Sequence, residues 1–322
     1  MDHGLSERGG EVLAAEICRY CRQTVLKAMD AVRSRMRGSD RLALKEAVVD
    51  PRTDKSELNL TKGIDRDAED LIVTALQKKF SKLKGIGSFT VFSEELGLRS
   101  FPDAGKEDES DWVVFIDPID GTEFIETLQG GWALVAVYNR RADEVVATVA
   151  GDIFLNRLYW GMKGAVPECL DLVTHSWFKL DGGPNPRRSL AGARVNFLTT
   201  KVSRFLSVAQ QTRLLKAIEK GDGRINLSWG SNMIIQVAAG YADAAVEFTK
   251  GFATYDVLPG LYLGEQAGLT ILDLDGNPVS TKLDIDAIFR TYRDNPKTPA
   301  RTAFIAAKEP SLAREIVGLL QP

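Results

Sequence analysis

The segment from Trp112 to Ile116 is apolar at every position and ends directly at Asp117. An apolar run without alternation predicts a β-strand that is buried on both faces of its sheet. Such a strand needs other elements packed against each side of the sheet. Along the whole chain, predicted strands and helices alternate without an internal repeat, which favours an α+β fold of layered sheets covered by helices.

The spacing of apolar residues gives the expected positions of the other elements. Helices are predicted at 8–37, 64–80, 203–219, 230–240, 255–267 and 311–320, and strands at 89–92, 132–138, 144–153, 157–160, 194–199, 243–248, 269–273 and 302–307. The polar stretch 39–60, which contains Pro51, and the charged segment 97–111 are expected to be loops.

A change of composition suggests where the chain divides. The stretch 161–192 is rich in Gly, Pro and Arg, so we expect an insertion or a domain junction there. We therefore predict an N-terminal α+β domain at 1–165, a junction at 166–192 and a C-terminal α/β domain at 193–322.

The overall composition disfavours several classes of partner. The net charge is −3 with acids and bases interspersed, so no basic surface for nucleic acid is expected. No apolar run approaches the roughly 20 residues of a membrane span, and the polar segment Met1–Gly10 does not resemble a signal peptide. The three cysteines, an odd number, fit a reducing compartment. We therefore expect a soluble, cytoplasmic protein.

Histidine, cysteine and zinc chemistry have little support in this sequence. The two histidines are His3, in a terminus expected to be disordered, and His175, inside the predicted junction. Cys18 and Cys21 form a C-x-x-C in a predicted helix without a second pair, so ordinary thiols are favoured over a zinc site. Acid–base work therefore falls to carboxylates, hydroxyls and metal ions.

The densest group of reactive side chains is Asp117-Pro118-Ile119-Asp120-Gly121-Thr122. Asp117 and Asp120 lie three positions apart at the end of the buried strand, and Pro118 stiffens the backbone between them. The carbonyl of Ile119 can turn toward the same point as the two carboxylates. Mg²⁺ prefers such oxygen ligands and shares them with substrate phosphate.

Gly121 and Thr122 are expected to begin a helix directly after this turn. Amides at a helix N-terminus favour an anion, so a cation and a phosphate can be held side by side. The alternative explanation of Asp117 and Asp120 is a helix cap and a turn aspartate.

Other carboxylates lie at the predicted ends of elements. Glu94 and Glu95 follow the strand at 89–92, while Asp65 and Asp256 lie at helix starts. Taken alone, the glutamates are typical of a solvated loop, and the aspartates are typical of helix caps. Adjacent strand ends can nevertheless bring Glu94 alongside Asp117, which favours a shared site.

These segments resemble the motifs of the inositol monophosphatase family, within the lithium-sensitive, magnesium-dependent phosphatase superfamily. The family's D-P-[IL]-D-G-T motif stands at Asp117–Thr122, and its acidic motif at Ser93–Glu95. Its helix-start motif resembles Thr61–Asp65 with Glu69 four residues later, and its C-terminal motif resembles Tyr255–Gly260. The four matches occur in family order.

The resemblance implies a layered α-β-α-β-α sandwich, a homodimer and a Mg²⁺-dependent phosphomonoesterase with two or three metal ions. It implies that Glu94, Asp117 and the Ile119 carbonyl bind a first Mg²⁺. Asp117, Asp120 and Asp256 would bind a second, and Glu94 would also help to hold a third, weaker ion.

The resemblance also implies roles in catalysis and substrate binding. Asp65 and Thr122 would orient and deprotonate the attacking water, with Glu94 as a further catalytic carboxylate. The amides of Gly121 and Thr122 would hold the phosphate. The other implied substrate contacts are Asp120 beside the phosphate, and Gly230, Ser231 and Asn232 on the hydroxylated side of the substrate.

Several positions depart from the family pattern. Two changes are expected to be minor, namely Tyr255 for Trp and Ser93 for Gly. Family inositol phosphatases carry a Glu seven residues before the last metal aspartate, where this chain has Thr249. Glu247 lies nine before it, which predicts a longer loop at 249–254. Lys250 in that loop is either a solvated lysine or a contact for a second anionic group.

We therefore expect the substrate to be a small phosphorylated polyol or sugar, similar to inositol monophosphate. Fructose 1,6-bisphosphate and 3′-phosphoadenosine 5′-phosphate stay open as alternatives. A haloacid-dehalogenase-type phosphatase is disfavoured, since its aspartates lie two positions apart and Asp117 and Asp120 lie three apart. A catalytically silent metal- or ligand-binding protein also stays open, because fold alone does not fix function.

Overall fold

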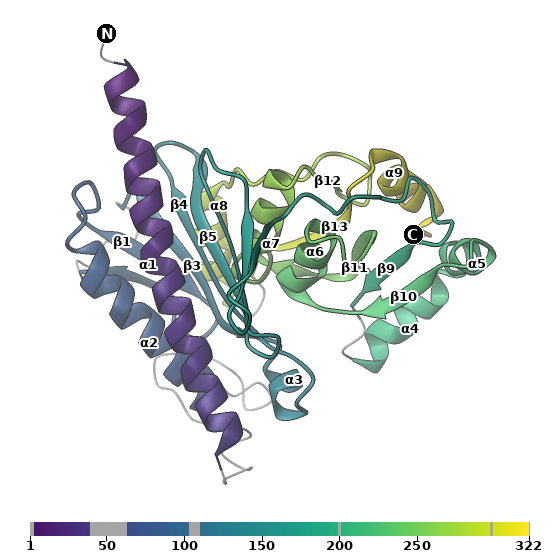
Figure 1. The fold of residues 1–322 in the computed structure, drawn as a ribbon, viewed down its shortest axis with the longest axis horizontal. Coiled ribbons are helices and arrows are strands. Elements are labelled where there is room, and N and C mark those ends of the chain that lie inside the picture. Colours follow the sequence, from purple (N-terminus) through teal and green to yellow (C-terminus); the bar gives the residue numbers. More distant parts are fainter. Residues whose placement is uncertain (1–2, 39–62, 103–109, 199–200, 297–298, 322) are drawn as a thin grey trace. The chain divides into compact units, whose positions relative to one another are not determined.

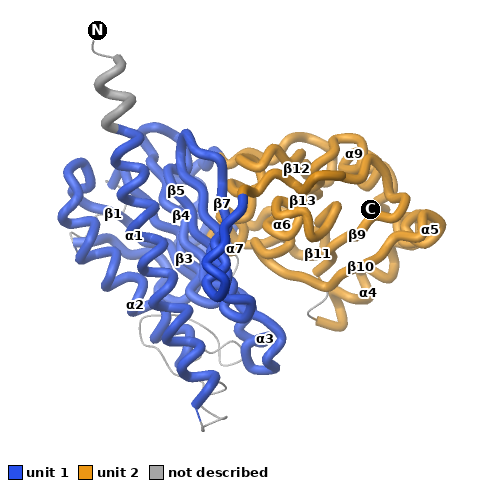
Figure 2. The backbone as a smooth tube through the Cα atoms, viewed as in Figure 1, with its two compact units in different colours: residues 1–178, 282–300 blue, residues 179–281, 301–322 orange. Residues whose placement is uncertain are grey.

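The computed structural model describes residues 3–38, 63–102, 110–198, 201–296 and 299–321 (Figure 1). The expected loop at 39–60 and the helix-start residue Thr61 lie outside these ranges. The chain forms two compact units, unit 1 at 1–178 with 282–300 and unit 2 at 179–281 with 301–322 (Figure 2).

Unit 1 is built on an eight-stranded sheet in the order β2-β1-β3-β4-β5-β6-β7-β8. Its strands are β1 (Phe89–Ser93), β2 (Gly97–Phe101), β3 (Trp112–Asp120), β4 (Trp132–Asn139), β5 (Glu144–Asp152), β6 (Arg157–Met162), β7 (Glu168–Asp171) and β8 (Trp177–Lys179). β1 and β3 are parallel, whereas the successive pairs from β3 to β7 are antiparallel. Every residue of β3 is buried, which confirms the prediction from its apolar run.

Helices cover both faces of this sheet, more completely on one than on the other. The helices of unit 1 are α1 (His3–Arg37), α2 (Gly63–Phe80), α3 (Thr122–Glu126) and α8 (Ile285–Asp294). α1 and α2 lie against one face, where Val25 and Leu76 share a core with Val114 (Figure 1). On the other face, the ring of Phe92 contacts Phe289 of α8 with 6.0 Å between ring centroids.

Unit 2 is a five-stranded sheet with helices on both faces, in the strand order β10-β9-β11-β13-β12. Its strands are β9 (Arg194–Phe197), β10 (Arg224–Leu227), β11 (Ala244–Ala253), β12 (Thr270–Leu272) and β13 (Arg301–Ala307), and its helices are α4 (Val202–Gln210), α5 (Thr212–Lys220), α6 (Gly230–Ala238), α7 (Thr254–Gln266) and α9 (Pro310–Leu319). α4, α5 and α9 share a core with Phe197 and Val246 on one face. On the other face, the Asn196 side chain donates to Gln236 of α6 at 2.8 Å.

The α+β prediction is confirmed, but several elements differ from expectation. The segment 97–111 is not wholly a loop, because Gly97–Phe101 forms β2 as a hairpin with β1. The helix expected at 203–219 is broken at Gln211 into α4 and α5. The stretch 161–192 contains β7 and β8. Within the described ranges, no helix is long and apolar enough to cross a membrane.

Candidate active site

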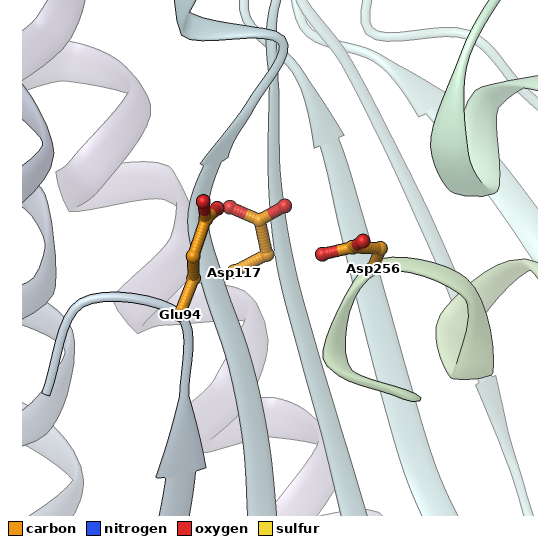
Figure 3. A group of neighbouring side chains, drawn as sticks. All are labelled: Glu94, Asp117 and Asp256. Atoms are coloured by element: carbon orange, nitrogen blue, oxygen red, sulfur yellow. The ribbon is translucent and has the colours of Figure 1, made fainter. Parts of the chain in front are cut away.

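The carboxyl ends of β1 and β3 place two acidic side chains together. In this parallel pair Ser93 lies opposite Ile116, and the amide of Glu94 donates to the Ile116 carbonyl at 3.3 Å. The next residues, Glu94 and Asp117, therefore lie side by side at the same edge of the sheet. Their carboxylate oxygens come within 4.8 Å of each other and turn toward one another (Figure 3). Asp117 is 1% exposed, and Glu94 is half-buried.

A β-bulge brings Asp120 to the same face of the sheet as Asp117. Residues three apart on a regular strand point to opposite faces. Here Asp117 pairs with Leu134 and Asp120 pairs with Trp132, so three steps on β3 match two steps on β4. The extra residue returns Asp120 to the face of Asp117. Pro118 suits this bulge because it has no N–H to donate to the ladder.

Thr122 links the end of the bulge to helix α2. Its hydroxyl lies 2.8 Å from Oδ1 of Asp65 and 3.0 Å from the Ile119 carbonyl. A hydroxyl has one hydrogen, so only one of these two acceptors receives it at a time. Asp65, in the first turn of α2, is 3% exposed. Gly121 makes the turn into α3 with φ 86°, a left-handed conformation that a side chain disfavours.

Ser93 organises the turn that carries Glu94, which the sequence analysis did not foresee. Its hydroxyl donates to Oε1 of Glu69, a residue that is 1% exposed. The same hydroxyl oxygen accepts the amide of Glu95 at 3.2 Å, and Glu69 accepts the amide of Leu96 at 3.0 Å. The presence of Ser93, where the family has Gly, is therefore not a minor change in this chain. The available signal was a serine followed by a turn, where a hydroxyl often accepts a nearby amide.

In unit 2, Asp256 lies in the first turn of α7 and is half-buried. Its Oδ2 accepts the amide of Ala253 at 3.1 Å, so this carboxylate caps its own helix. Ser231, at the start of α6, is 0% exposed and donates its hydroxyl to the backbone carbonyl of Asp256 at 2.6 Å. Next to it, the Asn232 side chain donates to the Ser228 hydroxyl at 3.0 Å.

The predicted loop at 249–254 is wrong, because β11 continues to Ala253. Five steps from Glu247 to Phe252 on β11 match two steps on β13, which makes an extended bulge. Glu247 is 0% exposed, and its Oε1 accepts the amides of Thr249, Lys250 and Gly251 at 2.9, 2.8 and 3.0 Å. Glu247 therefore holds the bulge together. Lys250 is exposed, with its Nζ 5.3 Å from the Phe252 ring centroid.

The cysteines are buried free thiols. Burial raises the pKa of Cys18 and of Cys169 to about 12, and it raises the pKa of Cys21 as well. A thiol with a raised pKa is a poor nucleophile and a poor metal ligand at neutral pH. This agrees with the interpretation of Cys18 and Cys21 as ordinary thiols.

The acidic group of unit 1 suits a hard divalent cation. Glu94, Asp117 and Asp120 offer only carboxylate oxygens, the donor type that Mg²⁺ prefers. Asp117 and Asp120 are 1% and 8% exposed, so their negative charges are largely withdrawn from water. Buried like charges in one group repel each other, and a bound cation relieves that repulsion.

Comparison with known proteins adds the identity of the fold. The chain matches the Inositol monophosphatase family over residues 14–321. An inositol monophosphatase from Anabaena (Nostoc) has 14% identity and a TM-score of 0.65, with 95% of this chain and 96% of that chain covered. The extragenic suppressor protein suhB of Bartonella henselae has 18% identity and a TM-score of 0.66, with 95% and 98% covered.

A third similar structure is the inositol monophosphatase SaIMPase-II of Staphylococcus aureus, solved with inositol monophosphate and with 2′-AMP. It has 15% identity and a TM-score of 0.59 in both complexes, with 93% of this chain and 91% of that chain covered. None of the curated proteins matches the chain. The family match spans nearly the whole sequence, so the chain belongs to the inositol monophosphatase family, whose members are metal-dependent phosphoric monoester hydrolases.

Proposed function

We propose that the protein is a Mg²⁺-dependent phosphomonoesterase acting on a small phosphorylated polyol or sugar similar to inositol monophosphate. The observation that carries the proposal is the carboxylate pair of Glu94 and Asp117, whose oxygens lie within 4.8 Å at two parallel strand ends. The bulge that turns Asp120 to the same face adds a third carboxylate.

In this proposal, Glu94, Asp117, Asp120, Asp256 and the Ile119 carbonyl hold two Mg²⁺ ions, with Glu94 also near a third. Asp256 belongs to unit 2, and its place among the proposed ligands rests on the family resemblance. Bound Mg²⁺ lowers the pKa of water and neutralises charge on the phosphate. The carboxylate of Asp256 also caps its own helix, since its Oδ2 accepts the amide of Ala253.

Thr122 and Asp65 are the proposed pair that orients the attacking water. When the Thr122 hydroxyl donates to Asp65, its oxygen lone pairs are available to accept a hydrogen from water. The water proton then passes to Thr122 Oγ1 as the Thr122 proton passes to the Asp65 carboxylate, so Asp65 becomes neutral and the negative charge moves to the hydroxide that attacks the phosphate. Glu94 is the further catalytic carboxylate of the proposal.

The proposed phosphate contacts are the amides of Gly121 and Thr122 at the start of α3, beside Asp120. The hydroxylated part of the substrate is proposed to meet Gly230 and Asn232 at the start of α6. The hydroxyl of Ser231 is already engaged with the backbone of α7, so only its amide is proposed as a substrate contact. Lys250 is the proposed contact for a second anionic group in a bisphosphate substrate.

The substrate class has support from the relatives rather than from the described residues. SaIMPase-II has been solved with both a polyol phosphate and a nucleotide phosphate. Fructose 1,6-bisphosphate and 3′-phosphoadenosine 5′-phosphate are therefore kept as alternatives. A homodimer and a cytoplasmic location are part of the same proposal, and the buried free thiols support a reducing compartment.

The test is phosphate release from a panel of phosphomonoesters with and without Mg²⁺. The panel holds inositol 1-phosphate, fructose 1,6-bisphosphate, 3′-phosphoadenosine 5′-phosphate, 2′-AMP and histidinol phosphate. We expect Mg²⁺-dependent release from at least one of them, loss of release in Asp120→Asn, and inhibition by Li⁺. Asp275→Asn, the same change at an exposed turn residue, is the matched control and is expected to keep wild-type activity.

The outcomes separate an enzyme from a binder. Near-normal turnover in folded Asp120→Asn would exclude the proposed metal ligands. Silence across the panel, combined with a melting temperature that Mg²⁺ raises, would support the catalytically silent metal-binding alternative. Trapping of a phosphorylated aspartate would point to the haloacid-dehalogenase-type mechanism instead.

A further inference from the structure

At the start of α7, beside Asp256, one hydrogen bond of the helical ladder is lacking and a side chain contacts the groups of the next step. In a regular helix, the amide of each residue donates directly to the carbonyl four positions earlier. Pro259 has no N–H, so the step from residue 259 to residue 255 lacks its hydrogen bond. The following step joins Gly260 to Asp256, and a side chain from α6 enters it.

That side chain is Ser231. Its Oγ donates to the Asp256 carbonyl at 2.6 Å, and the Gly260 amide donates to the same Oγ at 2.9 Å. The hydroxyl thus bridges the acceptor and the donor of one helical step. An inserted side chain of this kind bends a helix and fixes the direction of the turn before it.

The packing around this bridge leaves little room for another arrangement. Ser231 is 0% exposed. A Cβ built on Gly260 would lie 2.8 Å from the Ser231 Cα and 2.9 Å from its carbonyl oxygen. The absence of a side chain at residue 260 therefore allows α6 to approach α7 closely enough for the hydroxyl to reach both groups.

We propose that Ser231 is a positioning residue for the Asp256 carboxylate: its hydroxyl, inserted between the Asp256 carbonyl and the Gly260 amide, fixes the first turn of α7. This inference rests on the proposed function, because Asp256 is a metal ligand only in that proposal. Two hydrogen bonds hold Asp256. The Ala253 amide donates to its Oδ2, and the Ser231 hydroxyl donates to its backbone carbonyl. Removing the hydroxyl frees the turn, and the carboxylate loses its preorganised direction toward a cation.

The experiment measures Mn²⁺ binding to the full-length protein by electron paramagnetic resonance, with no substrate present. The variants are Ser231→Ala, which removes the hydroxyl, and Ser231→Cys, which keeps the volume but hydrogen-bonds weakly. Ser110→Ala is the matched control, because Ser110 is also buried and its hydroxyl also joins backbone groups, those of Ser88 and Trp112. Circular dichroism checks that each variant is folded at the temperature used.

We expect both Ser231 variants to bind Mn²⁺ about 10- to 100-fold more weakly than wild type, the usual effect of losing a partner that orients a metal ligand. Ser110→Ala should keep wild-type affinity even where its melting temperature falls. Wild-type affinity in folded Ser231→Ala would overturn the inference. Wild-type affinity in Ser231→Cys alone would also overturn it, by assigning the effect to volume and not to the hydroxyl.

Asp256→Asn separates this inference from the proposed function. If Asp256→Asn weakens Mn²⁺ binding and Ser231→Ala does not, the proposed metal site stands and the positioning role is refuted. If Asp256→Asn itself binds Mn²⁺ as wild type does, Asp256 is not a ligand, and the proposed site and the inference fail together.

Discussion

Asp152 gives a pH dependence of stability whose size follows from the structure. It ends β5, is 5% exposed, and its Oδ1 accepts the amides of Phe154 and Leu155 at 3.0 and 2.8 Å. Burial is the largest influence on this carboxyl and raises its pKa from 3.8 to about 6, against the lowering effect of those amides and of Arg157. The folded protein therefore holds this proton more tightly than the unfolded chain does.

The sign and the magnitude follow from proton linkage. Between about pH 4 and pH 6 the folded state binds more protons at Asp152, so the free energy of unfolding falls as the pH rises through this window. A shift of about two pKa units corresponds to about 3 kcal/mol, since each unit is worth 1.36 kcal/mol. Above about pH 6 the contribution of Asp152 to the free energy of unfolding is lost completely, and below the unfolded pKa it is fully present.

The perturbation that isolates this group is Asp152→Asn, which keeps the Oδ1 acceptor for both amides but cannot ionise. Urea unfolding of both proteins across about pH 4 to pH 7 gives their difference in unfolding free energy, from which other titrating groups cancel. We expect the free energy of unfolding of Asp152→Asn, relative to that of wild type, to rise by about 3 kcal/mol from the low to the high end of this pH range. A difference that does not change with pH would refute the reasoning.

Asp171 serves as the control. Its carboxylate also accepts two backbone amides, but its stability contribution changes with pH in the opposite direction. Its Oδ1 accepts the amides of Val173 and Thr174, and these hydrogen bonds lower its pKa at an accessible position. Its contribution to stability is present above the unfolded pKa and is lost as the pH falls through the lowered folded pKa. Asp171→Asn should therefore lose stability relative to wild type as the pH rises from acid.

Three further predictions test the residues around the site. Thr122→Val removes the donor to Asp65 and should lower kcat in the phosphate-release assay by about 10²- to 10⁴-fold, whereas Thr122→Ser should keep most of the activity. Glu247→Ala should lower the free energy of unfolding by about 2–4 kcal/mol because three backbone amides of the bulge lose their buried acceptor, and Glu247→Gln should lower it less; equal values in urea unfolding would contradict this. Ser93→Ala should cost about 1–2 kcal/mol and weaken Mg²⁺ binding in calorimetry, since Glu69 and the turn lose a shared hydroxyl; unchanged Mg²⁺ affinity would count against its role.

Long periodic or uniformly apolar segments were the predictable part of the fold. α1, α2 and β3 follow from patterns of ten or more residues or from an unbroken apolar run, and such signals depend less on tertiary context than those of short segments do. Two short elements, β2 and α8, were not predicted. β2 has four non-glycine residues and owes its conformation to pairing with β1, and the 10-residue α8 is fixed by aromatic contacts to Phe92.

The acids of the candidate site and their convergence were expected from the sequence, but the backbone geometry that brings them together was not. A spacing of three would place Asp117 and Asp120 on opposite faces of a regular strand, and only the bulge reverses that outcome. Pro118 is the single local hint, since a residue without an N–H fits poorly in an unbroken ladder. The pairing of Ser93 with Ile116, which brings Glu94 to Asp117, depends on the register of β1 and β3, which are separated in the sequence by residues 94–111.

The roles of Glu247 and Ser231 show most clearly what could not be predicted from the sequence. The position of Glu247 predicted only a longer loop after it, yet its Oε1 accepts three amides of the bulge that it closes. Ser231 was implied as a substrate contact, yet its hydroxyl completes a step of α7 that lies next to Pro259. In both cases the side chain satisfies backbone groups that an irregular element leaves without their usual partners. The sequence identifies the polar residue. The irregular backbone whose groups it satisfies forms only when strands and helices have packed.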